Sequence, residues 1–302
     1  MINSIALSLL LGFELSYYLL IIQTGIVEHY NSDLIALFPM FAGGVIGTVL
    51  AGRTWKKYDN PIQKIMIALS LQLLLSFLYP NYNIFTLFLL GLAVGLMAPL
   101  GIYLFKHKQL KELLFALAVA YTMGTYSFTS EADSRLYMAV IITAIALLSS
   151  IVLREYKIVQ NTKKTRHSIL SYAPLVLWIL LDSNLFETLS RHTGLNIWAH
   201  YTTVIIIFHL LGLLAAYFLN LFKSQEHIFI SSLFIMSYAL SYLEWPFLLA
   251  IVYPFTISFY NVVVFRTLSH ETSLSKLALI MIFVGWIASG LGLTLALSGI
   301  LH

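Results

Sequence analysis

Apolar stretches long enough to cross a membrane recur along nearly the whole chain. A helix needs about 20 mainly apolar residues to cross a hydrocarbon core of roughly 30 Å. We predict eleven such spans, at residues 3–26, 34–52, 61–79, 83–105, 110–128, 135–153, 168–190, 199–221, 227–243, 246–265 and 275–300. Soluble domains carry about 25% charged residues, whereas this chain carries 10%, with 60% hydrophobic residues. The sequence therefore predicts an all-α polytopic protein whose partner is the lipid bilayer.

Lysine and arginine fall almost entirely on one side of these spans. With the N-terminus in the cytoplasm, fifteen of them lie inside, and Arg135 and Arg191 lie outside. Because cytoplasmic loops are enriched in basic residues, the partition supports both the orientation and the number of spans. The formal net charge of +4 then reflects topology, and we expect no nucleic-acid partner. The opening segment lacks a basic region and a cleavage site, so we predict that it is retained as the first helix. We expect the protein to lie in the inner (plasma) membrane.

The longest polar segment, Arg154 to His167, separates the sixth span from the seventh. It predicts an N-terminal six-helix bundle (1–153), a cytoplasmic linker (154–167) and a C-terminal five-helix bundle (168–302). At an offset of about 168 residues, Glu14 falls over Asp182. The halves therefore look like two pseudo-repeats (6+5), which is a plan known among transporters.

The segment that ends the second span resembles the signature loop of the major facilitator superfamily. That motif runs glycine, three residues, Asp-Arg, one residue, Gly-Arg and a basic residue. Residues 47–57 here read GTVLAGRTWKK, so Gly47 and the basic end match. Ala51 stands at the aspartate position and Thr54 at the second glycine. The small residues and proline that end the fourth span, GLAVGLMAPLGIYLF, also look like the close-packing helices of this family.

The resemblance implies a short secondary transporter of about eleven helices that works by alternating access. In that family the first, fourth, seventh and tenth helices line the central path. Glu14 and Asp182 fall on the first and seventh spans, and Arg53 lies in the signature loop as a candidate gating residue.

The seventh span carries the most informative charges. Glu187 and Arg191 are four residues apart with the acid first, which favours a helical ion pair at the external end and a role in gating. Asp182 has no basic residue three or four positions away. A carboxylate at bilayer depth is costly, so it should face a cavity, a partner or a substrate. The partner of Asp182 must come from another helix, from water or from a ligand.

Several polar side chains on other spans are candidates to accompany Asp182. His209 sits at a similar depth in the eighth span, where it bonds a carbonyl or hydroxyl, exchanges protons with Asp182, or binds a metal. Glu14 has Tyr17 and Tyr18 at i+3 and i+4; it is either a protonated acid bonded to tyrosine or a cavity carboxylate. The tenth span adds a polar stripe that serves packing or lines a path, including Tyr253, Tyr260 and Asn261 beside Pro254.

No lysine or arginine lies in the middle of a span. The buried acids must therefore be neutral, or be neutralised by a proton or a cationic cargo. This disfavours an anion exchanger. External histidines and acids (Glu28, His29, Asp33, His192 and His200) contain no H-x-x-H pair, so we predict no metal site.

The sequence favours a proton-coupled secondary transporter of a small molecule or ion that is neutral, cationic or a metal. The alternatives are a membrane scaffold or assembly component that does not transport, and a ten-helix transporter of the drug/metabolite type. The chain lacks N-D-x-x-D, G-x-S-x-G and H-E-x-x-H motifs, so we predict no enzyme and no cofactor. The sequence leaves the oligomeric state open.

Overall fold

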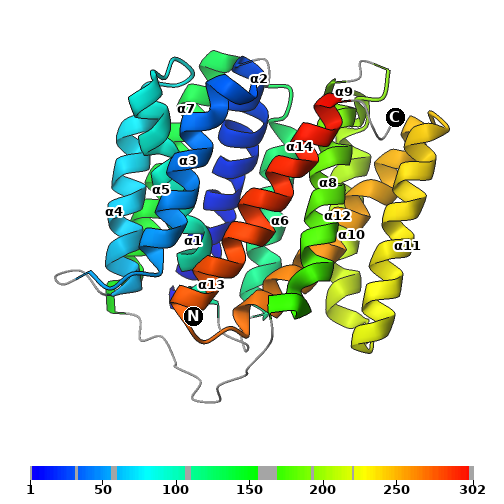
Figure 1. Cartoon of the computed structure of the whole chain (residues 1–302). Coiled ribbons are helices and arrows are strands. Elements are labelled where there is room, and N and C mark those ends of the chain that lie inside the picture. Colours follow the sequence, from blue (N-terminus) through cyan, green and yellow to red (C-terminus); the bar gives the residue numbers. More distant parts are fainter. Residues whose placement is uncertain are drawn as a thin grey trace. The chain divides into compact units, whose positions relative to one another are not determined.

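A computed structural model describes residues 2–30, 33–55, 60–105, 110–155, 169–191, 194–219 and 221–298. Throughout these ranges the ordered elements are helices (Figure 1). The predicted linker lies largely outside the described residues, and so do Lys56, Lys57 and His192.

The described residues form eleven long helical segments, which confirms the predicted fold class. Their bounds are Ile2–His29 (α1 Ile2–Tyr17, η1 Tyr18–Ile26, α2 Val27–His29), α3 (Leu34–Ala51), α4 (Pro61–Ser76), α5 (Ile84–Leu104), α6 (Leu110–Tyr126), α7 (Ala132–Val152), α8 (Ala173–Arg191), α10 (Thr202–Phe218), α11 (Lys223–Tyr242), α12 (Pro246–Ser269) and Leu274–Ser298 (α13 Leu274–Met281, η4 Ile282–Ile287, α14 Ala288–Ser298). Shorter turns are η2 (Leu153–Glu155), η3 (Ile169–Tyr172) and α9 (Ile197–His200). By length and composition, six of the segments are clear membrane-span candidates.

Side-chain caps explain where several helices begin. Asp33 accepts hydrogen bonds from the backbone N–H groups of Ile35 and Ala36 at the start of α3. Asn83 and Thr86 form a reciprocal capping box at the start of α5. Such caps satisfy backbone donors that have no partner inside the helix. The polar residues between spans therefore set the helix ends.

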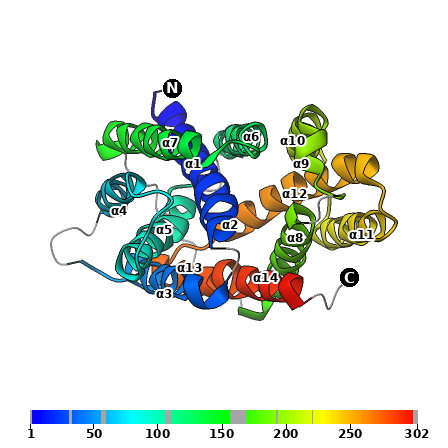
Figure 2. The same cartoon turned by 90° about the horizontal axis from the view of Figure 1, so that it is seen from above.

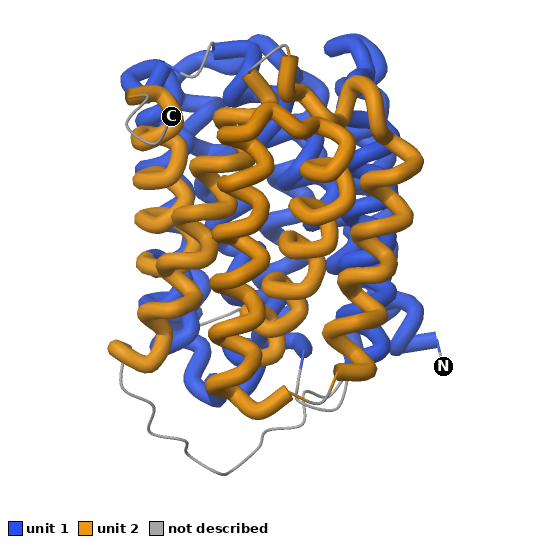
Figure 3. The backbone as a smooth tube through the Cα atoms, turned by 90° about the vertical axis from the view of Figure 1, so that its right-hand side faces the viewer, with its two compact units in different colours: residues 1–165, 267–282 blue, residues 166–266, 283–302 orange. Residues whose placement is uncertain are grey.

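The chain forms two compact units (Figure 3). Unit 1 comprises residues 1–165 and 267–282, and unit 2 comprises residues 166–266 and 283–302. The last long helical segment contributes to both, because α13 belongs to unit 1 and α14 to unit 2.

Unit 1 is held together by an unusually close pair of helices, α3 and α5, which lie side by side (Figure 2). Gly43 and Gly47 of α3 lie against the backbone of Phe88 and Leu92 in α5, and Gly91 and Gly95 of α5 lie against that of Met40 and Gly44 in α3. A Cβ atom added to Gly43, Gly47, Gly91 or Gly95 would lie 2.0–2.2 Å from a backbone oxygen of the other helix. Thr48 Oγ1 also donates to Gly95 O across the contact, at 3.0 Å. Only glycine permits this approach, which is typical of helix pairs in membranes.

Unit 2 contains a similar contact between α8 and α14. Gly292 faces the backbone of α8, where an added Cβ would lie 2.6 Å from Leu180 O. Ser183 Oγ donates to Ser289 O at 2.9 Å. This contact fixes the position of α8, the helix that carries Asp182.

Candidate functional site

The carboxylate of Asp182, at the centre of α8, is held by two tyrosines of α12. Tyr253 OH donates to Oδ1 at 2.8 Å and lies 3.0 Å from the backbone oxygen of Asp182. Tyr260 OH donates to Oδ2 at 2.5 Å. The tyrosines are seven residues apart, about two helical turns, so they share one face of α12. Both are buried, whereas Asp182 is partly exposed.

A third tyrosine, from α11, completes this polar cluster. Tyr238 OH lies 2.8 Å from both Leu181 O and Asn184 Oδ1 on α8. The sequence predictions missed Tyr238 and Asn184. The sequence could have indicated both residues, because a polar side chain within an apolar span needs a hydrogen-bond partner. Asn261, which the sequence did select, is partly buried beside Tyr260 on α12.

His209 has a different environment from the one that an Asp182–His209 pair requires. It is buried on α10, and its Nδ1 lies 2.7 Å from Ser258 Oγ on α12. Within the described residues, the hydrogen bonds to the Asp182 side chain come from Tyr253 and Tyr260. The structure therefore agrees with the first of the three predictions for His209, a hydrogen bond to a carbonyl or hydroxyl group.

In unit 1, the carboxylate of Glu14 accepts a hydrogen bond from α4. Gln72 Nε2 donates to Glu14 Oε2 at 3.0 Å and lies 3.4 Å from Thr143 Oγ1 on α7. Glu14, Gln72 and Thr143 are all buried. Gln72 Oε1 is also buried and has no hydrogen-bond partner among the described residues.

The first of the two tyrosines predicted beside Glu14 has a hydrogen-bond partner on α4. Tyr17 OH accepts a hydrogen bond from Ser76 Oγ at 3.2 Å, and Tyr18 is partly buried. Sequence spacing along α1 suggested an i+3 or i+4 partner, but helix packing supplied Gln72. The polar side chain of Gln72 within the third predicted span could have indicated this partner.

The gating candidates lie at the ends of their helices. Arg191 Nη2 is 2.7 Å from Glu187 Oε2, which is the helical ion pair that the spacing predicts. Arg53 is exposed just after α3, and its backbone oxygen accepts a hydrogen bond from Lys64 Nζ at 2.7 Å.

Two cations, Lys64 on the predicted inner side and Arg135 on the predicted outer side, are buried in the first turns of helices. Lys64 in α4 binds the carbonyls that end α3. Arg135 in α7 donates to Ser130 O at 3.0 Å and to Phe128 O at 2.6 Å. Cations are favourable beside carbonyls at helix ends. Both residues therefore stabilise the structure near the ends of spans, through hydrogen bonds to backbone oxygens of the preceding segment.

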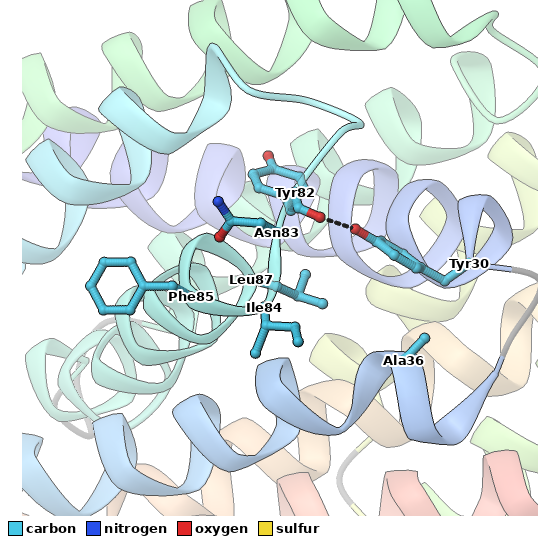
Figure 4. A pocket seen from close by; sticks show the side chains of 7 residues that line it. All are labelled: Tyr30, Ala36, Tyr82, Asn83, Ile84, Phe85 and Leu87. Carbon is cyan, nitrogen blue, oxygen red and sulfur yellow. Dashed lines mark hydrogen bonds between the residues drawn. The ribbon is translucent and has the colours of Figure 1, made fainter.

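A separate groove of about 530 Å³ in unit 1 lies where α2, α3 and α5 begin or end (Figure 4). Its lining residues are Tyr30, Ala36, Tyr82, Asn83, Ile84, Phe85 and Leu87. Tyr30 OH donates to Tyr82 O at 2.6 Å. Burial raises the pKa of the Tyr82 hydroxyl, so it stays neutral. None of the lining residues carries a charge, so the groove cannot bind a charged ligand through an ion pair as the carboxylate of Asp182 can.

Comparison with known proteins identifies the fold. No known family model and no curated protein matches the sequence. The structure is similar to the crystal structure of a major facilitator superfamily transporter, FucP, in the outward conformation. The TM-score is 0.59 at 14% identity, over 99% of this chain and 96% of that chain. The chain is therefore a multi-pass membrane protein with the major facilitator superfamily fold. The eleven long helical segments of the described residues contradict the ten-helix alternative.

Proposed function

We propose that this chain is a secondary transporter of a small solute that works by alternating access in the plasma membrane. Asp182 is its principal cargo-binding or proton-binding residue. The observation that carries this proposal is the environment of Asp182: a carboxylate at the centre of α8, the predicted seventh span, held by two neutral phenols.

The energetic argument concerns the charge of that carboxylate. An ionised group at bilayer depth is unfavourable unless it is paired, and hydrogen bonds from neutral hydroxyls compensate only part of its lost hydration. Among the described residues, the side-chain partners of Asp182 are two neutral phenols, and no lysine or arginine is bonded to it. Among the described residues of unit 2, Arg191 and Arg266 are paired with Glu187 and Glu226. A proton or a cationic cargo can therefore supply the missing charge, and either can arrive and leave.

Reconstitution into liposomes tests this function against the scaffold alternative. Purified full-length protein would be reconstituted with a pH-sensitive dye inside, and neutral and cationic solutes would be added to one side. We expect at least one solute to enter the liposomes and to change the internal pH, with no response in protein-free liposomes. A folded protein that moves neither solute nor protons would contradict the proposal and favour a scaffold role.

Glu14 supports a second prediction, on coupling. Glu14→Gln keeps an oxygen that can accept the hydrogen bond from Gln72, but it removes the titratable proton. We expect the variant to fold, to bind cargo with unchanged affinity, and to lose proton movement while cargo still equilibrates. Parallel measurements of cargo uptake and internal pH would check this. Proton movement at the wild-type ratio to cargo would show that Glu14 has no part in coupling.

A further inference from the structure

The Asp182 carboxylate has unused capacity to accept hydrogen bonds. An ionised carboxylate offers about four acceptor positions. In this site two phenol hydroxyls occupy one position on each oxygen. Tyr253 OH also lies within hydrogen-bond distance of the backbone oxygen of Asp182, and Tyr238 OH lies between two oxygens. Each hydroxyl has one proton to donate, so the cluster contains more acceptors than donors.

The charge of the cluster also favours a ligand that supplies hydrogen-bond donors. Within the described part of unit 2, Arg191 and Arg266 form ion pairs with Glu187 and Glu226, and Lys223 stands at the first residue of α11. None of these cations is bonded to Asp182, whose side-chain partners are the two phenols. A ligand with N–H donors and a positive charge would fill the free acceptor positions and also neutralise the carboxylate.

Aromatic rings pack against the two tyrosines that bind this carboxylate. Beyond Tyr253 and Tyr260, the Trp198 ring lies 6.3 Å from the ring of Tyr253, and the Phe234 ring lies 5.3 Å from that of Tyr260. The faces of such rings attract cations, and their edges and methylene neighbours accept apolar groups. A carboxylate among tyrosines therefore suits a cation that carries hydrocarbon.

We infer that the ligand of the Asp182 cluster is an organic ammonium ion, an inference that rests on the transport function proposed above. Its N–H groups fill the free acceptor positions, its charge neutralises the carboxylate, and its carbon skeleton contacts the tyrosine rings. A metal ion fits less well. Hard cations need six or more oxygen ligands, and the described residues contain no group of three or more histidines and acids able to hold a metal.

Paired ligands of equal shape test the charge preference directly. The probes are primary alkylamines and arylalkylamines of increasing size, each with the alcohol that has the same carbon skeleton. At neutral pH the amines are cationic and the alcohols are not. The readout is the unfolding temperature of purified full-length protein as a function of ligand concentration. We expect at least one ammonium ion to stabilise the protein at concentrations at least about 30-fold lower than its matched alcohol.

Two variants assign the effect to the site. Asp182→Asn should remove the preference for the ammonium ion, and Asp133→Asn, at an exposed position in α7, should leave it intact. The wild-type comparison of amine with alcohol stands even if Asp182→Asn does not fold. Equal binding of an alcohol and its amine, or no stabilisation by any amine, would overturn the inference.

Transport measurements separate this inference from the function on which it rests. An alcohol or another neutral solute that crosses the membrane with protons, while the amines do not bind, would overturn the ammonium inference and leave transport intact. Ammonium ions that bind through Asp182 without entering liposomes would support the binding inference and contradict transport.

Discussion

Replacing Asp182 with asparagine is expected to lower cargo uptake into liposomes by at least about 30-fold, because loss of one partner from a desolvated charged contact costs 2 kcal/mol or more. Asparagine has nearly the same volume and keeps one oxygen for a tyrosine hydroxyl. It carries neither the negative charge nor a titratable proton. The variant should therefore fold and fail in transport. Initial uptake rates, normalised to reconstituted protein, would measure the loss.

Loss of one tyrosine hydroxyl should lower uptake less than loss of the carboxylate. Tyr260→Phe removes one neutral hydrogen bond to the carboxylate, which is worth about 0.5–1.5 kcal/mol, so uptake should fall by about 2- to 10-fold. Asp133→Asn removes a carboxylate at an exposed position and should transport normally. Unchanged proton-coupled uptake by Asp182→Asn would contradict the assignment of this residue.

The number and limits of the helices could be predicted because the bilayer imposes them. Backbone groups in lipid must be bonded within the helix, so each span must be long, apolar and continuous. Capping residues such as Asp33 and Asn83 then set the starts. The predicted third span extended three residues beyond the end of α4 at Ser76, because the apolar residues Phe77 and Leu78 continue into the following turn.

The partners of the buried acids depend on how each helix is rotated about its axis, which hydropathy does not determine. α12 is apolar around most of its circumference, so its tyrosines could have faced several neighbours. The contacts from Asp182 to Tyr253 and Tyr260 join residues 71 and 78 positions apart. Depth in the membrane suggested His209 as a partner, but packing placed it beside Ser258. The residue types of the site were thus predictable, whereas most of the pairings were not.

Gly91→Ala is expected to destabilise the protein by about 1–2 kcal/mol, because an overpacking cost of about 2–3 kcal/mol, near the upper end of the usual range, exceeds the gain in helix propensity. The added methyl group would lie 2.0 Å from Met40 O, a backbone atom that no rotamer change can move. Helices α3 and α5 would have to separate along their contact. The gain in helix propensity from glycine to alanine, about 1 kcal/mol, offsets only part of this. Thermal or chemical unfolding in detergent would measure the difference.

Gly290→Ala is the matched control, because a Cβ at this position in α14 meets no atom within 4 Å. The same substitution should there stabilise the protein by about 0.5–1 kcal/mol, since alanine loses less backbone entropy in a helix. Opposite signs at the two glycines would show that the close approach of α3 to α5, and not glycine content in general, stabilises unit 1. If Gly91→Ala also raised stability, the helices would pack less closely than this contact requires.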